Sequence, residues 1–223
     1  MFLSSYWGIL FIAIILGVAT QAWVNGAFRQ YSKVPLATGQ SGAEVARAML
    51  DSNGLTDVRI ERIAGRLSDH YDPRVRVLRL SPDVHDGRTV AAAGVAAHEA
   101  GHAVQHARAF AFAKLRQALV PAASIGSQMA FPLIFAGFFL RFAGLITIGI
   151  VAFAAAVLFQ IVTLPVEFDA SRRALVALEG GGSLPAEQVA GARKVLGAAA
   201  MTYLAATLIA VMQLLYFIGL SRR

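Results

Sequence analysis

The residues best suited to chemistry are His98, Glu99 and His102, which form a His-Glu-x-x-His pattern within an alanine-rich run. On an α-helix, residues four apart lie on the same face, so both imidazoles could bind one zinc ion. Zinc lowers the pKa of a bound water to about 7, and a neighbouring carboxylate can take the proton as hydroxide attacks a carbonyl. The pattern therefore predicts a zinc site with Glu99 as general base. The alternative is two unrelated histidines on a packed helix.

The neighbouring sequence supports a helix around this pattern and excludes one class of zinc site. The run from Thr89 to Ala113 has many alanines and no proline, and Asp86 or Thr89 could cap its first turn. The extended metzincin pattern would need glycine at position 105 and histidine at position 108, where this chain has Gln105 and Arg108. A catalytic zinc usually has three protein ligands, so the third must come from elsewhere in the chain.

Two acidic residues further along the chain, Glu167 and Asp169, are the candidates for the third ligand. If Pro165 opens a helix there, the two side chains point about 200° apart, so only one of them can face the metal. We favour Glu167 as the metal ligand that joins the two histidines. The other carboxylate would then pair with Arg172 or Arg173 on the same helix.

The composition indicates a membrane protein. Of the 223 residues, 57% are hydrophobic and only 15% are charged, which is unusual for a soluble domain. Uncharged apolar runs long enough to cross a bilayer occupy Leu3–Val24, Val120–Leu140, Phe142–Val162 and Gly197–Leu220. The first run could instead be a cleaved signal peptide, but it lacks the basic start that such a peptide needs. The absence of cysteine excludes disulfides and thiolate ligands.

The segment before the zinc helix is predicted to be small and mixed. Ser41 and Glu44 fit a capping box that begins a short helix ending near Ser52. Two strands are expected at Val58–Glu61 and Arg74–Leu80, the second with a bulge where its alternation slips. We expect them to form a hairpin. Its edge strand could add an extended peptide beside the metal, or could merely pack on the helix.

These features give a mainly α, polytopic membrane fold with four spans and a small α+β peptidase portion. The predicted parts are a transmembrane helix at 1–24, the peptidase portion with the zinc helix at 25–116, a transmembrane hairpin at 117–163, a third-ligand helix and linker with Gly180–Gly182 at 164–196, and a transmembrane helix with a basic tail at 197–223.

Positive charge indicates which side of the membrane the predicted metal site occupies. Four spans place both termini on one side, which near the membrane has three cationic residues: Arg141, Arg222 and Arg223. The other side has eight: Arg29, Lys33, Lys114, Arg116, Arg172, Arg173, Arg193 and Lys194. Because lysine and arginine accumulate on the cytoplasmic side, we expect a multi-pass cell-membrane protein with a cytoplasmic metal site.

The order of these motifs resembles two groups of membrane proteases. A zinc helix, a membrane hairpin and then Glu-Phe-x-Ala are similar to the HtpX-type membrane gluzincins, in which that glutamate is the third ligand. Those proteins have aspartate where this chain has Ser171. The chain resembles the YugP-like family of membrane zinc metallopeptidases more closely, through residues 65–73, 80–81, 95–105 and 164–175. This resemblance implies a zinc-dependent membrane peptidase.

Several further polar residues are candidates for supporting roles. His70 and Tyr71 lie in the predicted hairpin turn, and either could stabilise an oxyanion, as could Arg172 or Arg173. His106 is about 12 Å along the helix axis from His98, too far to share one ion with both histidines, but it could lie in the shell around the ligands. The alternative roles for these residues are purely structural: stabilising a turn, contacting lipid headgroups or packing in the fold.

The function we predict is an integral membrane zinc endopeptidase that acts on membrane-associated or membrane-proximal polypeptides. Its partners are a polypeptide substrate and the lipid bilayer. Nucleic acid is not expected, because no basic tract is interleaved with aromatics, and an oligomer is possible. The rival is a catalytically silent scaffold with a closed, four-coordinate zinc site in which Asp169 or His70 is the fourth ligand. A metal transporter is disfavoured, because the four spans lack ionisable residues.

Overall fold

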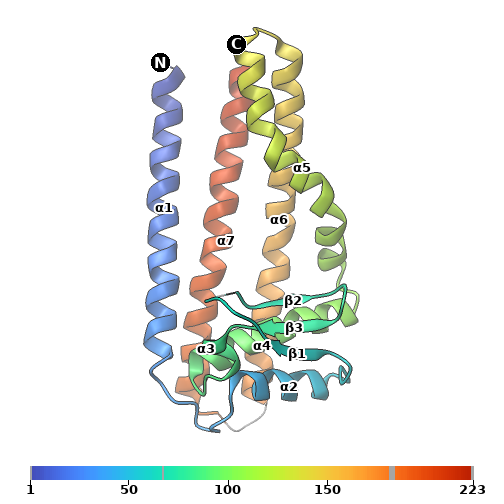
Figure 1. The fold of residues 1–223 in the computed structure, drawn as a ribbon. Coiled ribbons are helices and arrows are strands. Elements are labelled where there is room, and N and C mark those ends of the chain that lie inside the picture. The colour runs from blue at the N-terminus through green and yellow to red at the C-terminus, as the bar shows by residue number, and fades with distance from the viewer. Residues whose placement is uncertain (1, 67, 181–183, 222–223) are drawn as a thin grey trace. The chain divides into compact units, whose positions relative to one another are not determined.

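The computed structural model describes residues 2–66, 68–180 and 184–221, and these are mainly helical, as predicted. The elements are α1 (Phe2–Tyr31), α2 (Gly42–Ser52), β1 (Arg59–Arg62), β2 (His70–Asp72), β3 (Val77–Leu80), α3 (Pro82–His85), α4 (Val90–Ala107), α5 (Ala111–Phe139), α6 (Ala143–Gly180) and α7 (Ala186–Ser221) (Figure 1). They divide into two compact units. The helical unit comprises residues 1–20, 111–165 and 201–223, and the mixed unit comprises residues 21–110 and 166–200.

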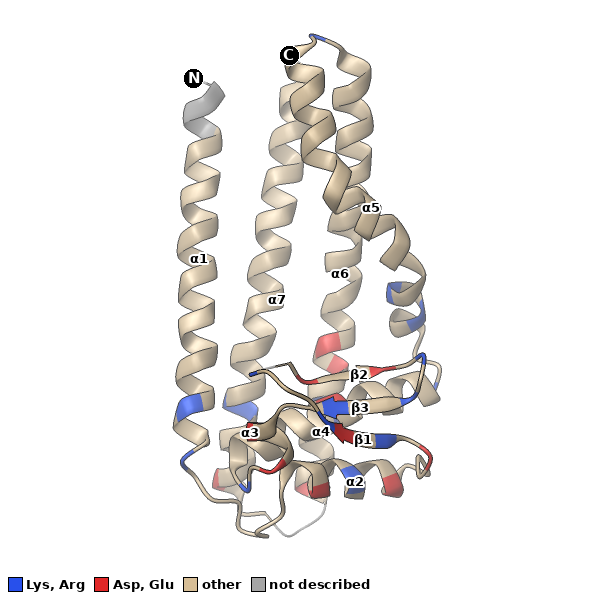
Figure 2. Cartoon of the chain, in the orientation of Figure 1, with Lys and Arg blue, Asp and Glu red and all other residues tan. Residues whose placement is uncertain are grey.

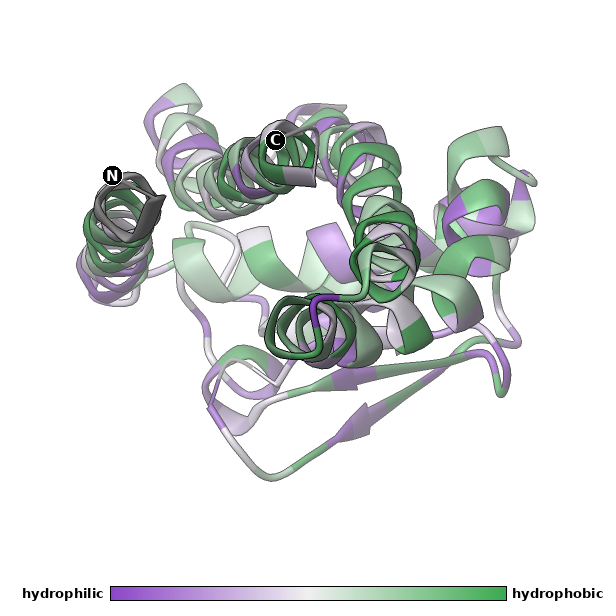
Figure 3. Cartoon of the chain, turned by 90° about the horizontal axis from the view of Figure 1, so that it is seen from above, coloured by the Kyte–Doolittle hydropathy of each residue, from purple (hydrophilic) through white to green (hydrophobic). Residues whose placement is uncertain are grey.

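Four helices, α1, α5, α6 and α7, are long and apolar enough to cross a membrane, which confirms the predicted number of spans. In the helical unit, the rings of Phe131, Phe153 and Phe217 meet with centroids 5.5 to 6.2 Å apart. α5 and α6 approach closely because Gly126 leaves no side chain between the helices, facing the carbonyl of Ala152. Seen from above, most of the helical turns are coloured as hydrophobic (Figure 3).

Two helix boundaries differ from the prediction. Pro165 does not open a new helix but lies inside α6, so the third span and the predicted third-ligand helix are one continuous element. A proline inside a helix removes a backbone hydrogen bond and crowds the preceding turn, but Val162 and Val166 on either side are buried, and their packing favours a continuous helix. The zinc helix, expected to reach Ala113, ends at Ala107, because Ala109 adopts a left-handed φ of 53° and the chain turns before α5 begins.

The joint before α7 is described only in part. α6 ends at Gly180, and Gly181 and Gly182 of the predicted linker lie outside the described residues together with Ser183. Pro185 stands immediately before α7, where its carbonyl accepts hydrogen bonds from the backbone N–H groups of Gln188 and Val189. Proline is suited to this position because the first turn of a helix needs no N–H from it.

The sheet of the mixed unit has the order β1-β3-β2, so the two predicted strands do not form the hairpin expected of them. The two predicted strands correspond to β1 and β3, which pair in parallel, with Arg59 opposite Val77. The stretch expected to be a turn contains β2, which is antiparallel to β3. Val77 and Leu78 are both buried and point to opposite faces of this central strand, so the slipped alternation reflects burial on both faces and not a bulge.

α4 lies at the centre of the core of the mixed unit. Its small residues, such as Ala96, Ala97 and Ala100, are fully buried, and they share a cluster with Leu50 of α2 and Leu78 of β3. α2 begins with the predicted capping box, in which Ser41 and Glu44 each bond the other's backbone N–H. Acidic and basic residues are frequent on α2 and the strands of this unit (Figure 2).

Candidate metal centre

α4 places the two histidines of the His-Glu-x-x-His pattern side by side. Thr89 caps the helix by accepting a hydrogen bond from the backbone N–H of Ala92, one of the two caps that the sequence suggested. The imidazole rings of His98 and His102 have centroids 4.8 Å apart and meet edge to face. The four-residue spacing therefore gives the expected pair of nitrogen donors on one face of the helix.

α6 brings Glu167 to this face through a close helix–helix contact. Gly101 of α4 lies against the backbone of Ala170 in α6, and a Cβ at position 101 would be only 2.8 Å from the Ala170 carbonyl oxygen. Gly101 follows His98 by three residues and Ala170 follows Glu167 by three, so each contact residue is one helical turn from a candidate ligand. The missing side chain at position 101 lets the carboxylate reach the imidazoles.

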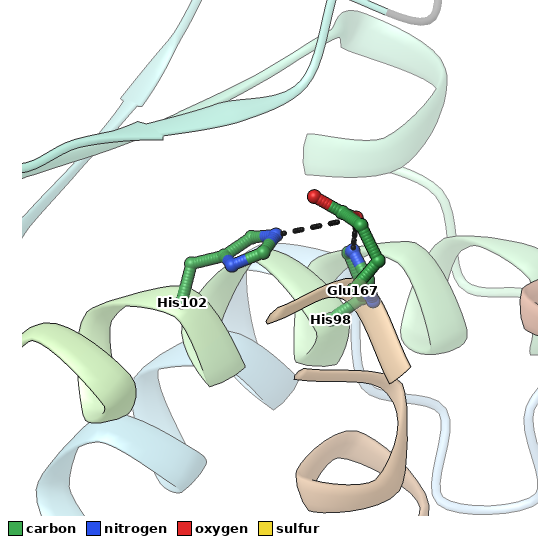
Figure 4. A group of neighbouring side chains, drawn as sticks. All are labelled: His98, His102 and Glu167. Atoms are coloured by element: carbon green, nitrogen blue, oxygen red, sulfur yellow. Dashed lines mark ion pairs between the residues drawn. The ribbon is translucent and has the colours of Figure 1, made fainter. Parts of the chain in front are cut away.

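The three candidate ligands form a compact donor set. One carboxylate oxygen of Glu167 is 3.3 Å from Nε2 of His98 and 3.7 Å from Nε2 of His102 (Figure 4). One ligand atom from each residue lies within 4.8 Å of the others. The Glu167 side chain is 4% exposed, so its charge is largely removed from water. Two imidazole nitrogens and one carboxylate oxygen are the ligands of a known class of catalytic zinc site, so the residues present fit this metal.

The electrostatics of the group are those of a charged pair shielded from solvent. Burial by itself lowers the pKa of His102, but the nearby carboxylates of Glu167 and Glu99 raise that pKa above its ordinary value. Glu99, directly after His98, is half-buried. The group is therefore arranged to hold positive charge, which a divalent cation would supply in place of a proton.

The sequence comparisons agree with this geometry. A family model described as "Putative neutral zinc metallopeptidase" matches residues 6–222, which is nearly the whole chain. The chain belongs to this family. It is also 45% identical over 206 residues to the "Putative membrane protease YugP" of Bacillus subtilis (strain 168), which covers 92% of each of the two chains. No solved structure matches the chain. The family is one of zinc peptidases, and His98, His102 and Glu167 are positioned to hold the ion.

In this member of the family, Gln105 is a residue that the sequence reasoning missed. It is 1% exposed, and its Oε1 accepts a hydrogen bond from Nδ1 of His102 at 3.0 Å. Its Nε2 donates to the carbonyl of Val166 and to Asp169, at 2.8 and 2.9 Å. Gln105 thus orients a ligand on α4 and joins it to α6. The signal in the sequence was a polar residue one turn after His102, on the helix face that carries both histidines.

Ser171 supports the other histidine in the same way. Its hydroxyl lies 3.1 Å from Nδ1 of His98 and can accept a hydrogen bond from it. With both Nδ1 atoms engaged in these contacts, both Nε2 atoms are left to face Glu167 and a metal. The sequence showed Ser171 only as a departure from the HtpX-type pattern, and the structure gives it a position next to a candidate ligand.

Asp169, the alternative third ligand, points away from the histidines. Its carboxylate accepts hydrogen bonds from Arg172 at 2.9 Å and from Arg173 at 2.6 Å, as expected for the carboxylate that does not face the metal. Arg172 is exposed, and the structure places it on this ion pair. Asp169 therefore belongs to the shell around the ligands, through its contact with Gln105.

The remaining candidates lie outside the group of three. Tyr71 is on strand β2 and not in a turn, and its hydroxyl is 3.0 Å from Nδ1 of His106 at the end of α4. His70, also on β2, is exposed, and its Nδ1 lies 2.8 Å from the carbonyl of Ser68. Any role of these three residues or of Arg172 in the reaction stays a prediction.

Proposed function

We propose that this chain is an integral membrane zinc endopeptidase in which His98, His102 and Glu167 hold the ion. The single observation that carries the proposal is the convergence of two histidines from α4 and one buried glutamate from α6 within 4.8 Å. When bound, zinc would polarise the substrate carbonyl and lower the pKa of water. Glu99 would take the proton from the attacking water and return it to the leaving amine.

Open coordination separates this proposal from that of a silent structural zinc site. Structural sites usually have four protein ligands, whereas catalytic sites have three and keep one position for water or substrate. Among the residues that the structure describes, the donor group contains three. Asp169, suggested as a fourth ligand, is held by arginines, and His70 lies outside the group. This supports the enzyme over the scaffold.

The decisive experiment compares zinc content and cleavage in the Glu99→Gln variant. Glutamine keeps the shape but cannot take the proton, so we expect zinc to stay at wild-type occupancy and peptide hydrolysis to fall by about 100-fold or more. His102→Ala is the companion variant, and it should lose both zinc and hydrolysis. Undiminished cleavage by purified Glu99→Gln protein would refute Glu99 as the base.

For the substrate, we propose a polypeptide that lies close to the membrane and adds to strand β2. Glu167 is on the same continuous helix as the third span, and β2 is an edge strand of the sheet. An extended peptide paired with an edge strand is held mainly by its backbone N–H and C=O groups. N-methylation of alternate peptide bonds in a peptide inhibitor should therefore weaken inhibition. Equal inhibition by the methylated peptide would argue against strand addition.

For localisation, we propose a multi-pass cell-membrane protein with its metal site on the cytoplasmic side, on the basis of eight cationic residues against three. The chain contains no cysteine, so single introduced cysteines can report sidedness directly. Thr56→Cys, in an exposed turn of the mixed unit, should react with an impermeant thiol reagent only after the cells are opened. Leu140→Cys, 70% exposed in the α5–α6 turn, should react in intact cells. The reverse labelling pattern would show that the metal site lies on the opposite side of the membrane.

A further inference from the structure

A cavity of about 540 Å³ lies in the mixed unit, where the end of α1 meets the loop before β2 and the start of α4. The residues that matter for its chemistry are Phe28, Arg29, Ser32, Arg66, Asp83 and Thr89. None of them belongs to the candidate metal centre. The cavity is open on one side and large enough for a small charged group.

Two of the lining residues are arginines from distant parts of the chain. Arg29 is in the last turn of α1, and Arg66 is in the loop between β1 and β2. Both are exposed, and neither forms an ion pair with another residue in the described parts of the chain. Elsewhere in the mixed unit, arginines such as Arg62, Arg76 and Arg79 are paired with acids. Two exposed arginines without an ion pair among the described residues therefore line the cavity, and guanidinium groups bind phosphate well.

The same cavity also presents one negative group. Asp83, at the start of α3, is exposed and has no ion pair within the described residues. The neighbouring Asp86, which also lines the cavity, differs because it is already engaged by Arg62 and His85. The negative charge of Asp83 would weaken the binding of a free phosphate ion. A ligand with a phosphate and a nearby ammonium would satisfy both charges.

The position of Arg29 along α1 points to a lipid as the source of such a ligand. α1 is a candidate membrane span, and Trp23 is 55% exposed near its end, as expected of an interfacial aromatic residue. Arg29 follows six residues later, about 9 Å further along the helix axis. That distance corresponds to the headgroup layer beyond the hydrocarbon edge. Acyl chains could then run along the apolar surface of α1.

We propose that this cavity binds the headgroup of an aminophospholipid such as phosphatidylethanolamine. Arg29 and Arg66 hold the phosphate, Ser32 and Thr89 offer hydroxyl groups beside it, and Asp83 accepts hydrogen bonds from the ammonium. The site is separate from the zinc ligands and does not depend on hydrolysis, although it does depend on α1 lying in the membrane.

Lipid binding to the purified full-length protein in detergent tests the proposal. Native mass spectrometry would compare phosphatidylethanolamine, phosphatidylglycerol and inorganic phosphate. We expect phosphatidylethanolamine to bind more tightly than the other two. Each of Arg29→Gln and Arg66→Gln should weaken its binding by about fivefold. Arg74→Gln, an exposed arginine in the β2–β3 turn, is the matched control and should leave binding unchanged.

Asp83→Asn provides the sharpest result, because removing one negative charge should act in opposite directions on the two lipids. The substitution should weaken the binding of phosphatidylethanolamine and strengthen the binding of phosphatidylglycerol. Equal binding of phosphatidylethanolamine to wild type and the Arg29→Gln/Arg66→Gln double variant would overturn the proposal. So would inorganic phosphate that competes at equal concentration, which would indicate a phosphate site without lipid. Unchanged zinc content in each variant would show that the fold is intact.

Discussion

The close contact between Gly101 and Ala170 allows a prediction about how the metal centre is assembled. A Cβ added at position 101 would be 2.8 Å from the Ala170 carbonyl oxygen and 3.3 Å from its carbonyl carbon and Cα. Ordinary contact begins near 3.4 Å, so Gly101→Ala would require α4 and α6 to separate by about 0.6 Å. The atoms that the new Cβ would meet belong to the Ala170 backbone, so no side-chain rotation can relieve the contact.

The expected magnitude follows from that displacement. Overpacking of this kind destabilises a protein by about 1–3 kcal/mol. Because Glu167 is one turn before Ala170, the same separation draws its carboxylate away from the two imidazoles. Misplaced support of a metal ligand typically weakens metal affinity by about 10–100-fold. We therefore expect Gly101→Ala to lose zinc affinity in that range and to unfold at a lower temperature.

The assay is zinc affinity by chelator competition, combined with thermal unfolding of the protein in detergent. Gly94→Ala is the matched control, because the same change on the same helix puts the new Cβ 3.4 Å from Ala192, an ordinary contact. It should keep zinc affinity and, since alanine favours helix over glycine, should not lower stability. If Gly101→Ala binds zinc as tightly as Gly94→Ala does, the close approach of α4 and α6 does not position the third ligand.

Further predictions concern the shell around the ligands, the caps and the metal. Gln105→Leu should weaken zinc binding by about 10–100-fold in chelator competition, because His102 loses the acceptor that orients it, and unchanged affinity would remove Gln105 from the centre. Ser41→Ala should lower the free energy of unfolding by about 1 kcal/mol in denaturant titration through loss of the α2 cap, and no loss would show the cap to be dispensable. The backbone hydrogen bond from Ser41 holds the pKa of Glu44 below its ordinary 4.5. The ionised Glu44 carboxylate therefore stabilises the fold fully above pH 4.5, and this stabilisation is lost as the pH falls below the lowered pKa. Glu44→Gln should accordingly be less stable than wild type at neutral pH and closer to it in acid, as unfolding curves at the two pH values would show. Adding zinc at about 100 times its dissociation constant to protein stripped of metal by a chelator should raise the free energy of unfolding by about 2.7 kcal/mol in the same assay. The His98→Ala variant should show no such gain.

The predictions that succeeded rest on local or compositional signals. The four spans follow from long runs without charge, and the capping box of α2 follows from two residues three apart. The errors are at places where a distant contact overrides a local rule. Pro165 favours a helix start, yet α6 continues through it because its buried neighbours hold the helix. The strand pairing was predicted wrongly because the three residues of β2 are too few to show a strand pattern in the sequence. Their pairing with β3 is seen only in the folded sheet.

The sequence by itself determined the donor pair of His98 and His102, because the period of an α-helix fixes which residues share a face. It also limited the third ligand to Glu167 or Asp169, which a helix points in different directions. Only the tertiary structure decided between them, since that choice depends on how α6 rotates against α4 at the contact of Gly101 with Ala170. The roles of Gln105 and Ser171 were decided in the same way. Ser171 bonds His98 only once α4 and α6 have packed together, and the same packing brings Gln105, which bonds His102 within α4, to Val166 and Asp169.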